Sequence, residues 1–325
     1  MRNPYFPPVF LLMSEKQLTF RENDIAQILN KVYLSFKEGE FDEAIVLLEK
    51  ALAIDFEYQD VTNALKCANF WSERLERVAA IAGDYEKGEY YLNQWKVFGG
   101  FVSRMENLSE RCLFTLKYFV FGRALEHYLA LYNETDMSDP GILFRIGRCH
   151  KSRGSYENAL RFLEMASQIK RDDAAILAEL ADCYSLVNES RAAKVFFREA
   201  FFLDPQDIEL SYLEAPMIQR LAASLRERFG DVDVREWIPI YATVYGLFNV
   251  KRELRPLELG KLKQAIHQLE REVQEGSEAR VPRLINHYLW LIDHFLSSGE
   301  QRSKVEEVLS RIQELDPDVF NEYTN

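Results

Sequence analysis

The chain has 325 residues, 47% of them hydrophobic, with only 14 glycines and 10 prolines. This composition indicates a globular protein with a sizeable core and disfavours both a disordered chain and a loop-rich β fold. The net charge of −12 argues against general affinity for nucleic acid or anionic lipid, because their phosphates would be repelled.

Residues 1–19 are predicted to form a tail in front of the first helix. The apolar stretch 9–12 is short, prolines precede it and no small-residue cleavage site follows, so a secretory signal is not indicated. No segment reaches the ~18–20 uninterrupted apolar residues of a membrane helix. Met13 is an alternative start, which would leave 1–12 as an extension. We therefore expect a cytoplasmic protein that does not insert into membranes.

Pairs of helices are predicted between about 20 and 205. In the first pair, Gly39 marks a turn, and Ala44 and Ala51 follow at the spacing of one helix face. The helix before this turn, 23–37, has a poorer pattern. Further along the chain, the corresponding small residues are Gly83, Gly88 and Ala124.

The clearest pair of helices is predicted at 141–152 and 156–169, with Gly154 at a turn that often needs a left-handed conformation. Antiparallel helices pack closely only where small residues lie between them. Three small residues are placed for this: Gly147, Ala159 and Ala166. The same pattern recurs 34 residues later, from Ala159 to Ala193, with Ala181, Asn188 and Ala200 at the other corresponding positions. Pro205 ends this second pair of helices, because proline cannot continue a helix.

These features resemble the tetratricopeptide repeat (TPR), a helix–turn–helix unit of about 34 residues. The resemblance implies an all-α, right-handed α-solenoid with about five repeats over 20–205. It also implies that the first helix of each hairpin lines a concave side, where a peptide or partner helix binds. The implied structural positions are Gly39, Ala44, Ala51, Gly83, Gly88, Ala124, Gly147, Gly154, Ala159, Ala166, Ala181, Ala193, Ala200 and Pro205.

The period fails in the C-terminal region, 206–325. Helices are predicted at 210–230, at the very apolar 237–250 and after Pro256. A final hairpin at 282–317 is interpreted as a degenerate repeat that caps the solenoid. A separate helical domain is the alternative, and the lack of a Gly/Ser/Pro-rich linker favours continuity.

Eight residues are predicted to face solvent in the concave groove and to bind a partner: Tyr33, Phe36, Phe144, Arg145, Arg148, Lys151, Glu179 and Asp182. Arg145, Arg148 and Lys151 form a basic stripe on an acidic protein, which favours an acidic or C-terminal carboxylate ligand. The alternative is that Arg148 pairs with Glu179 or Asp182 on the adjacent helix and merely solvates that face. The lysine–asparagine–arginine clamp of TPR proteins that bind chaperone tails is not reproduced.

No catalytic or cofactor-binding motif is found in the sequence. His287 and His294 lie about 10 Å apart along a helix, too far to share a metal ion. The four cysteines are predicted to be buried free thiols, because they lie in helical segments without CxxC spacing. We expect no enzymatic activity, no cofactor and no metal.

The function favoured by these observations is a non-catalytic scaffold or adaptor that binds a protein or peptide in the concave groove. One alternative is an accessory subunit of a transport or secretion system that holds a small molecule or lipid. Another is a structural protein that self-associates into a homo-oligomer through the apolar segment 237–250.

Overall fold

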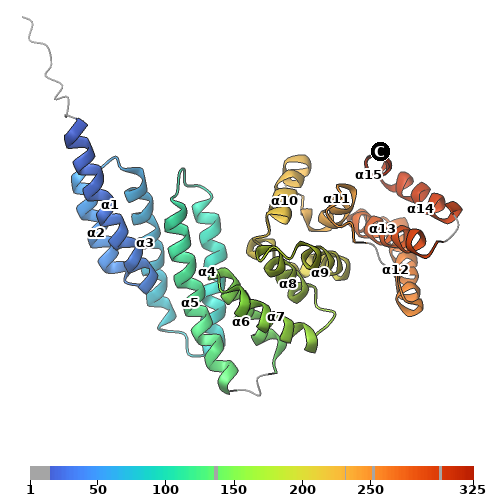
Figure 1. The fold of residues 1–325 in the computed structure, drawn as a ribbon, viewed down its shortest axis with the longest axis horizontal. Helices are drawn as coiled ribbons and strands as arrows, with labels where there is room; N and C mark the ends of the chain where they lie inside the picture. The colour runs from blue at the N-terminus through green and yellow to red at the C-terminus, as the bar shows by residue number, and fades with distance from the viewer. Residues whose placement is uncertain (1–14, 135–137, 231, 251–252, 300–301) are drawn as a thin grey trace, which may run out of the picture. The chain divides into compact units, whose positions relative to one another are not determined.

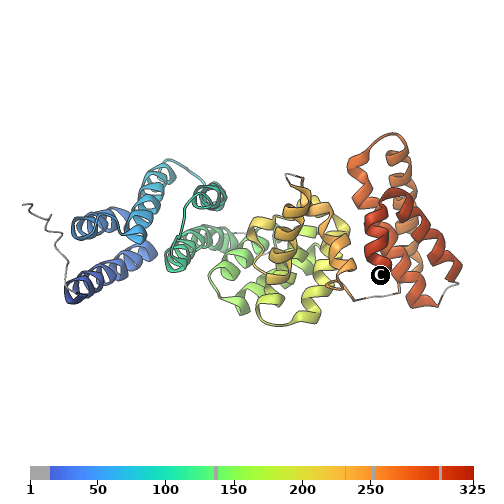
Figure 2. The same cartoon turned by 90° about the horizontal axis from the view of Figure 1, so that it is seen from above.

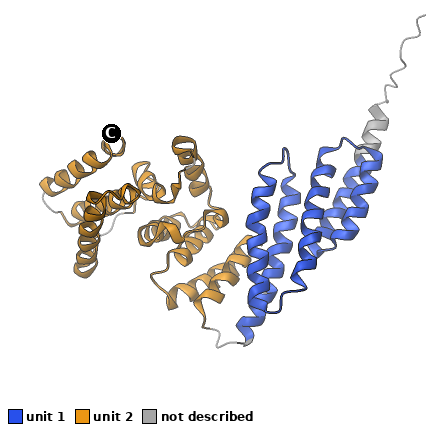
Figure 3. Ribbon diagram, turned by 180° about the vertical axis from the view of Figure 1, so that it is seen from behind, with its two compact units in different colours: residues 1–134 blue, residues 135–325 orange. Residues whose placement is uncertain are grey.

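The computed structural model describes residues 15–134, 138–230, 232–250, 253–299 and 302–325. The alternative start, Met13, and most of the expected tail lie outside these residues. The described chain contains fifteen α-helices and no strand (Figure 1), so the all-α prediction is confirmed. It divides into two compact units, residues 1–134 and 135–325 (Figure 3). None of the described helices is both long and apolar enough to cross a membrane.

The first unit contains five helices: α1 (Glu15–Glu38), α2 (Phe41–Ile54), α3 (Gln59–Val78), α4 (Asp84–Val102) and α5 (Glu110–Glu134). Helices α1 and α2 form a hairpin around Gly39, whose φ of +85° lies in the left-handed region. Helix α3 packs on α2, whereas α4 pairs mainly with α5, and α5 also packs on α1. Ala44, Ala51 and Ala124 are fully buried.

The pairing of α4 differs from the predicted repeat pattern. Gly88 lies against α5, where a Cβ atom would stand 2.6 Å from the Tyr128 ring. Gly83 is the N-cap residue of α4 with a φ of −92° and makes no left-handed turn. Five two-helix hairpins would need ten helices between Glu15 and Leu203, and the structure has nine α-helices there.

Large aromatic residues explain why α3 and α4 do not form a close hairpin. Trp71 of α3 lies against Trp95 and Phe98 of α4, with ring centroids 6.5 and 5.4 Å apart. Phe70 adds a third contact, 5.0 Å from the Phe98 ring. Rings of this size stand where a TPR hairpin has small residues, so the two helix axes cannot approach closely.

The second unit begins with two close hairpins, α6 (Pro140–Ser152) with α7 (Tyr156–Ile169), and α8 (Ala174–Leu186) with α9 (Ser190–Leu203). The bounds of α6 and α7 agree with the predicted helices at 141–152 and 156–169 to within one residue. Gly147 packs beneath Leu163, whose Cγ would lie 2.6 Å from an added Cβ. The small residues Ala159, Ala166, Ala181, Ala193 and Ala200 are all fully buried.

The two hairpin turns both use a left-handed residue, Gly154 with φ +79° and Asn188 with φ +64°. Nothing lies within 4 Å of an added Cβ at Gly154, so only backbone strain should decide the effect of a substitution there. We expect Gly154→Val to destabilise the protein by about 1–2 kcal/mol, and Gly154→Asn by less than about 1 kcal/mol. Urea denaturation of the two variants tests this, and equal losses would contradict the turn geometry.

Six further α-helices complete the second unit: α10 (Pro216–Phe229), α11 (Ile238–Val244), α12 (Pro256–Gln274), α13 (Val281–Ser298), α14 (Arg302–Leu315) and α15 (Pro317–Thr324). Helix α12 begins at Pro256 as predicted. The predicted helix at 237–250 ends early, because Gly246 with φ +68° follows α11. The predicted final hairpin at 282–317 ends earlier, because α15 starts at Pro317 and the Asp316 side chain caps it.

A continuous core joins the α8–α9 hairpin to the C-terminal helices. One cluster of buried hydrophobic residues runs from Ala174 to Val319. Arg198 of α9 pairs with Asp293 of α13, and both side chains are buried. Helices α12 to α15 pack in sequence at the C-terminal end of this unit (Figure 2). The shared core favours continuity over a separate C-terminal domain, and the division between units falls after Glu134 instead of at the predicted 205.

Candidate functional site

The residues predicted to form an exposed basic stripe are largely buried. Arg148 is 4% exposed, Lys151 and Glu179 are each 1% exposed, and Asp182 is fully buried. The expectation that these side chains face solvent is therefore wrong. Only Arg145 of the stripe keeps partial exposure, and it donates a hydrogen bond to the Gly141 carbonyl.

The four buried charges form one network between α6 and α8. Arg148 Nε donates to Glu179 Oε1 at 2.7 Å. Lys151 Nζ lies 2.5 Å from both Glu179 Oε2 and Asp182 Oδ2. The alternative interpretation is confirmed in its pairing of Arg148 with an acid of the adjacent helix, but the pair is buried and does not solvate that face.

The connection after α9 closes the network from the other side. Glu209 accepts from Arg148 Nη1 at 2.5 Å, and the Tyr212 carbonyl accepts from Lys151 at 2.9 Å. The backbone N–H groups of Glu214 and Ala215 both donate to Asp182. The chain thus supplies its own carboxylate and carbonyl to the cations that were expected to bind a partner.

Burial and the neighbouring charges shift the pKa of each group in the network by a different balance. Burial lowers the pKa of Lys151, but Asp182 and Glu179 outweigh it and raise that pKa above its ordinary value. Burial raises the pKa of Glu179, but Lys151 and Arg148 bring it below its usual range. Burial raises the pKa of Asp182 as well, and there Lys151 offsets it only in part. Asp182 is therefore the carboxylate that depends most on its lysine partner.

The aromatic residues predicted for the groove also lie in the interior. Phe144 is under the Arg148 guanidinium, which stands 4.5 Å from its ring centroid. In the first unit, Tyr33 and Phe36 are buried and pack on one another and on Phe41. These side chains hold helices together and offer no surface to a partner.

No cluster of three or more His, Cys, Asp or Glu residues in the described part of the chain could hold a metal ion. The buried histidines serve the fold: His287 bonds to the Arg283 carbonyl, and His294 accepts from the Leu254 N–H. The four cysteines are free and buried, as predicted.

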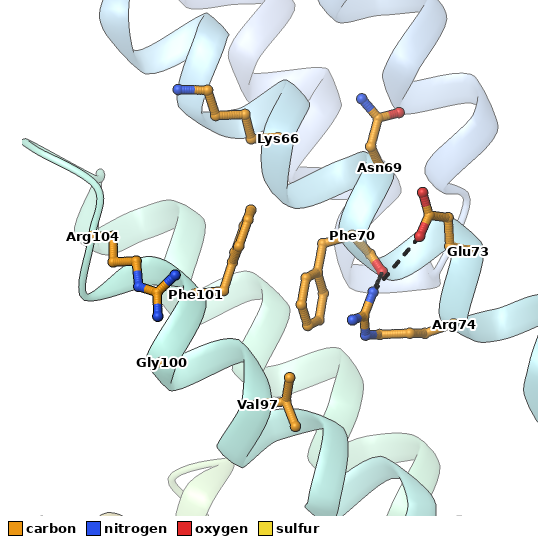
Figure 4. A pocket seen from close by; sticks show the side chains of 9 residues that line it. All are labelled: Lys66, Asn69, Phe70, Glu73, Arg74, Val97, Gly100, Phe101 and Arg104. Atoms are coloured by element: carbon orange, nitrogen blue, oxygen red, sulfur yellow. Dashed lines mark hydrogen bonds and ion pairs between the residues drawn. The ribbon is translucent and has the colours of Figure 1, made fainter.

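An open groove lies in the first unit, between α3 and α4 (Figure 4). Its volume of about 670 Å³ falls within the range of about 300–1,000 Å³ that is usual for ligand sites. Phe70 of α3 and Phe101 of α4 stack at its base, with ring centroids 5.0 Å apart. Val97, which is 52% exposed, extends the apolar surface along α4.

Three cations surround this aromatic base: Lys66, Arg74 and Arg104. The Arg74 guanidinium lies 3.3 Å from the Phe70 ring centroid and is fixed by hydrogen bonds to Gln94 and to the Phe70 carbonyl. Lys66 and Arg104 are exposed, and within the described residues neither forms a hydrogen bond or an ion pair. The groove therefore combines an apolar base with two cations that are available to a ligand.

This groove was missed from the sequence, although a signal for it existed. Gly99 and Gly100 occupy the last turn of α4, where consecutive glycines weaken a helix. Nothing lies within 4 Å of an added Cβ at either position, so close packing inside the chain does not account for them. A glycine pair inside a helical pattern, beside aromatic residues, marks this surface.

Comparison with known families supports the repeat interpretation. A tetratricopeptide repeat model matches residues 28–58. These residues form the later part of α1, all of α2 and the link to α3, which is a hairpin with a left-handed glycine turn. This chain therefore contains a tetratricopeptide repeat at residues 28–58. Tetratricopeptide repeats are modules of protein–protein interaction, and no match was found among curated proteins.

The matched repeat ends where α3 begins. The open groove therefore lies directly after the matched repeat, at the step where large aromatic residues replace small ones. The α6–α9 hairpins, on which the sequence resemblance was strongest, lie outside the matched residues.

Proposed function

We propose that this TPR protein is a non-catalytic scaffold or adaptor and that its partner protein binds in the α3–α4 groove. The observation that carries the proposal is the contrast between two basic surfaces. The 145–151 stripe is closed by the chain's own Glu209 and Tyr212, whereas Lys66 and Arg104 border an open aromatic groove. Its four free thiols favour a reducing compartment, so we place the protein in the cytoplasm.

Affinity capture from a lysate of the source organism tests the scaffold function. The bait is the full chain, compared with a Lys66→Glu/Arg104→Glu variant and with Arg145→Glu as a matched charge reversal elsewhere. We expect one specific protein to be retained by the wild type and by Arg145→Glu and to be lost from the double variant. If only the Arg145→Glu variant failed to retain the protein, the partner would bind at the predicted basic stripe and not in the groove.

Other results of the capture experiment separate the remaining functions. If the wild type retains no protein other than a second copy of itself, the self-associating alternative replaces the scaffold. If the wild type retains nothing specific, the scaffold function itself is contradicted.

A further inference from the structure

We infer that the α3–α4 groove binds an acidic peptide segment of the partner that carries one large apolar side chain. The inference rests on the proposed function and adds the chemistry of the partner. It is carried by three features of the groove: its aromatic base, its unpaired cations and a glycine in its wall.

The aromatic base selects an apolar anchor. Phe70 and Phe101 present stacked rings between the two helices (Figure 4), and Val97 leaves half of its surface exposed beside them. Apolar groups in a concave site give up water when a large side chain covers them, which is the main source of binding energy at interface anchors. Arg74 is held over one ring by Gln94 and the Phe70 carbonyl, so it belongs to the preformed wall.

The charges around the base select acidic flanking residues. Glu73 is the single acid among the residues that line the groove, and it lies 4.0 Å from Arg74. Lys66 and Arg104 remain to pair with carboxylates of a ligand. A short acidic segment can place its carboxylates only there, whereas a polynucleotide would extend its phosphates over the rest of a chain with a net charge of −12.

Gly100 lets a partner backbone come close to the groove. It lines the groove within the last turn of α4, and an added Cβ would meet nothing within 4 Å. A helical glycine that packs against nothing in its own chain exposes backbone to a close neighbour. Gly99 has the same open surroundings but does not line the groove, which provides a matched control.

Selection from a displayed library of random peptides of about 12 residues tests the inference. The library is selected on the full chain, and fluorescence anisotropy then measures the affinity of the enriched peptides. We expect these peptides to be acidic, to share a large apolar residue and to bind the Lys66→Glu/Arg104→Glu variant at least about tenfold more weakly. Enriched peptides that are basic or neutral, or that bind both forms equally, would overturn the inference.

Two leucine variants test the position of the peptide. Gly100→Leu should fill the groove and weaken peptide binding by about tenfold or more, whereas Gly99→Leu should leave binding unchanged. Thermal unfolding of both variants checks that the first unit remains folded. Equal binding by the two variants would place the peptide outside this groove.

A competition experiment distinguishes a peptide ligand from a nucleic-acid ligand, whose bases can also stack on the two rings. A single-stranded DNA of about 20 nucleotides should leave the enriched peptide bound, and its displacement of the peptide at similar concentration would overturn the inference. Failure here is distinguishable from failure of the scaffold function. If a captured partner depends on Lys66 and Arg104 but its binding segment is not acidic, the function stands and only the ligand chemistry is wrong.

Discussion

Replacement of Lys151 by methionine is expected to lower the free energy of unfolding by about 3–5 kcal/mol, because it leaves two carboxylates buried without their shared cation. Lys151 is 1% exposed and lies 2.5 Å from Glu179 and Asp182. Methionine fills a similar volume, so loss of charge and not loss of packing should dominate. Urea denaturation followed by far-UV circular dichroism measures the change.

The pH dependence of this loss identifies its electrostatic origin. Burial already raises the pKa of Asp182, and Lys151 offsets that rise, so removal of the lysine should raise the pKa further. A carboxyl whose pKa is raised by folding destabilises the protein above that pKa and ceases to do so as the pH falls through it. The difference between Lys151→Met and wild type should therefore shrink as the pH falls from neutral.

Lys170→Met is the matched control for this experiment. Lys170 also lies close to an aspartate, 2.6 Å from Asp173, but its side chain is 61% exposed. We expect a change within about 0.5 kcal/mol, because exposed ion pairs contribute little. If Lys151→Met changed the free energy of unfolding as little as Lys170→Met at neutral pH, the buried network would be contradicted. The basic stripe would then be open to solvent.

Gly88→Ala is expected to destabilise the first unit by about 1–3 kcal/mol, because an added methyl group overpacks the α4–α5 contact. The new Cβ would stand 2.6 Å from the Tyr128 ring. That ring is fully buried, and its hydroxyl donates to Glu89 at 2.5 Å, so it has little room to move. Thermal unfolding followed by circular dichroism measures the loss.

Gly99→Ala in the same helix should instead stabilise the first unit. Its added Cβ meets nothing within 4 Å, so the substitution gains helix propensity of up to about 1 kcal/mol. The pair of variants separates packing from propensity within α4. Stabilisation by both substitutions would show that Gly88 does not lie against Tyr128.

The α6–α9 hairpins could be predicted closely from the sequence because their signals are local. Gly147, Ala159 and Ala193 stand where helices touch, and Gly154 and Asn188 stand where the chain turns left-handed. Each of these positions depends on neighbours within one repeat. A repeat pattern therefore carries enough information to give both helix bounds and packing faces.

The surroundings of the basic stripe could not be predicted, because they depend on a segment without periodicity. Helical spacing showed that Arg148 and Lys151 share a face, but it did not show what covers that face. Two residues of the connection after α9 cover it: Glu209, which lies between two short 3₁₀ turns, and Tyr212, which ends the second turn. Irregular connections have no hydrophobic period from which their path could be read.

The groove was missed for a different reason. Over residues 81–98 the repeat interpretation followed only the small residues Gly83 and Gly88, and it gave no weight to the large aromatic residues beside them. In the structure Trp95 packs on Trp71 and holds the helices apart, which is how the groove between them arises. The departure from the repeat was itself the signal for the site.

Hydrogen–deuterium exchange of the full chain, with and without an enriched acidic peptide, shows which helices the peptide covers. We expect slower exchange at 66–74 and 97–104, because the peptide covers α3 and the end of α4 and shields their backbone from opening. We expect no change at 144–151 and 179–182, which the chain already covers. Protection of those two segments, with none at α3 and α4, would rule out the α3–α4 groove and place the partner on the predicted stripe.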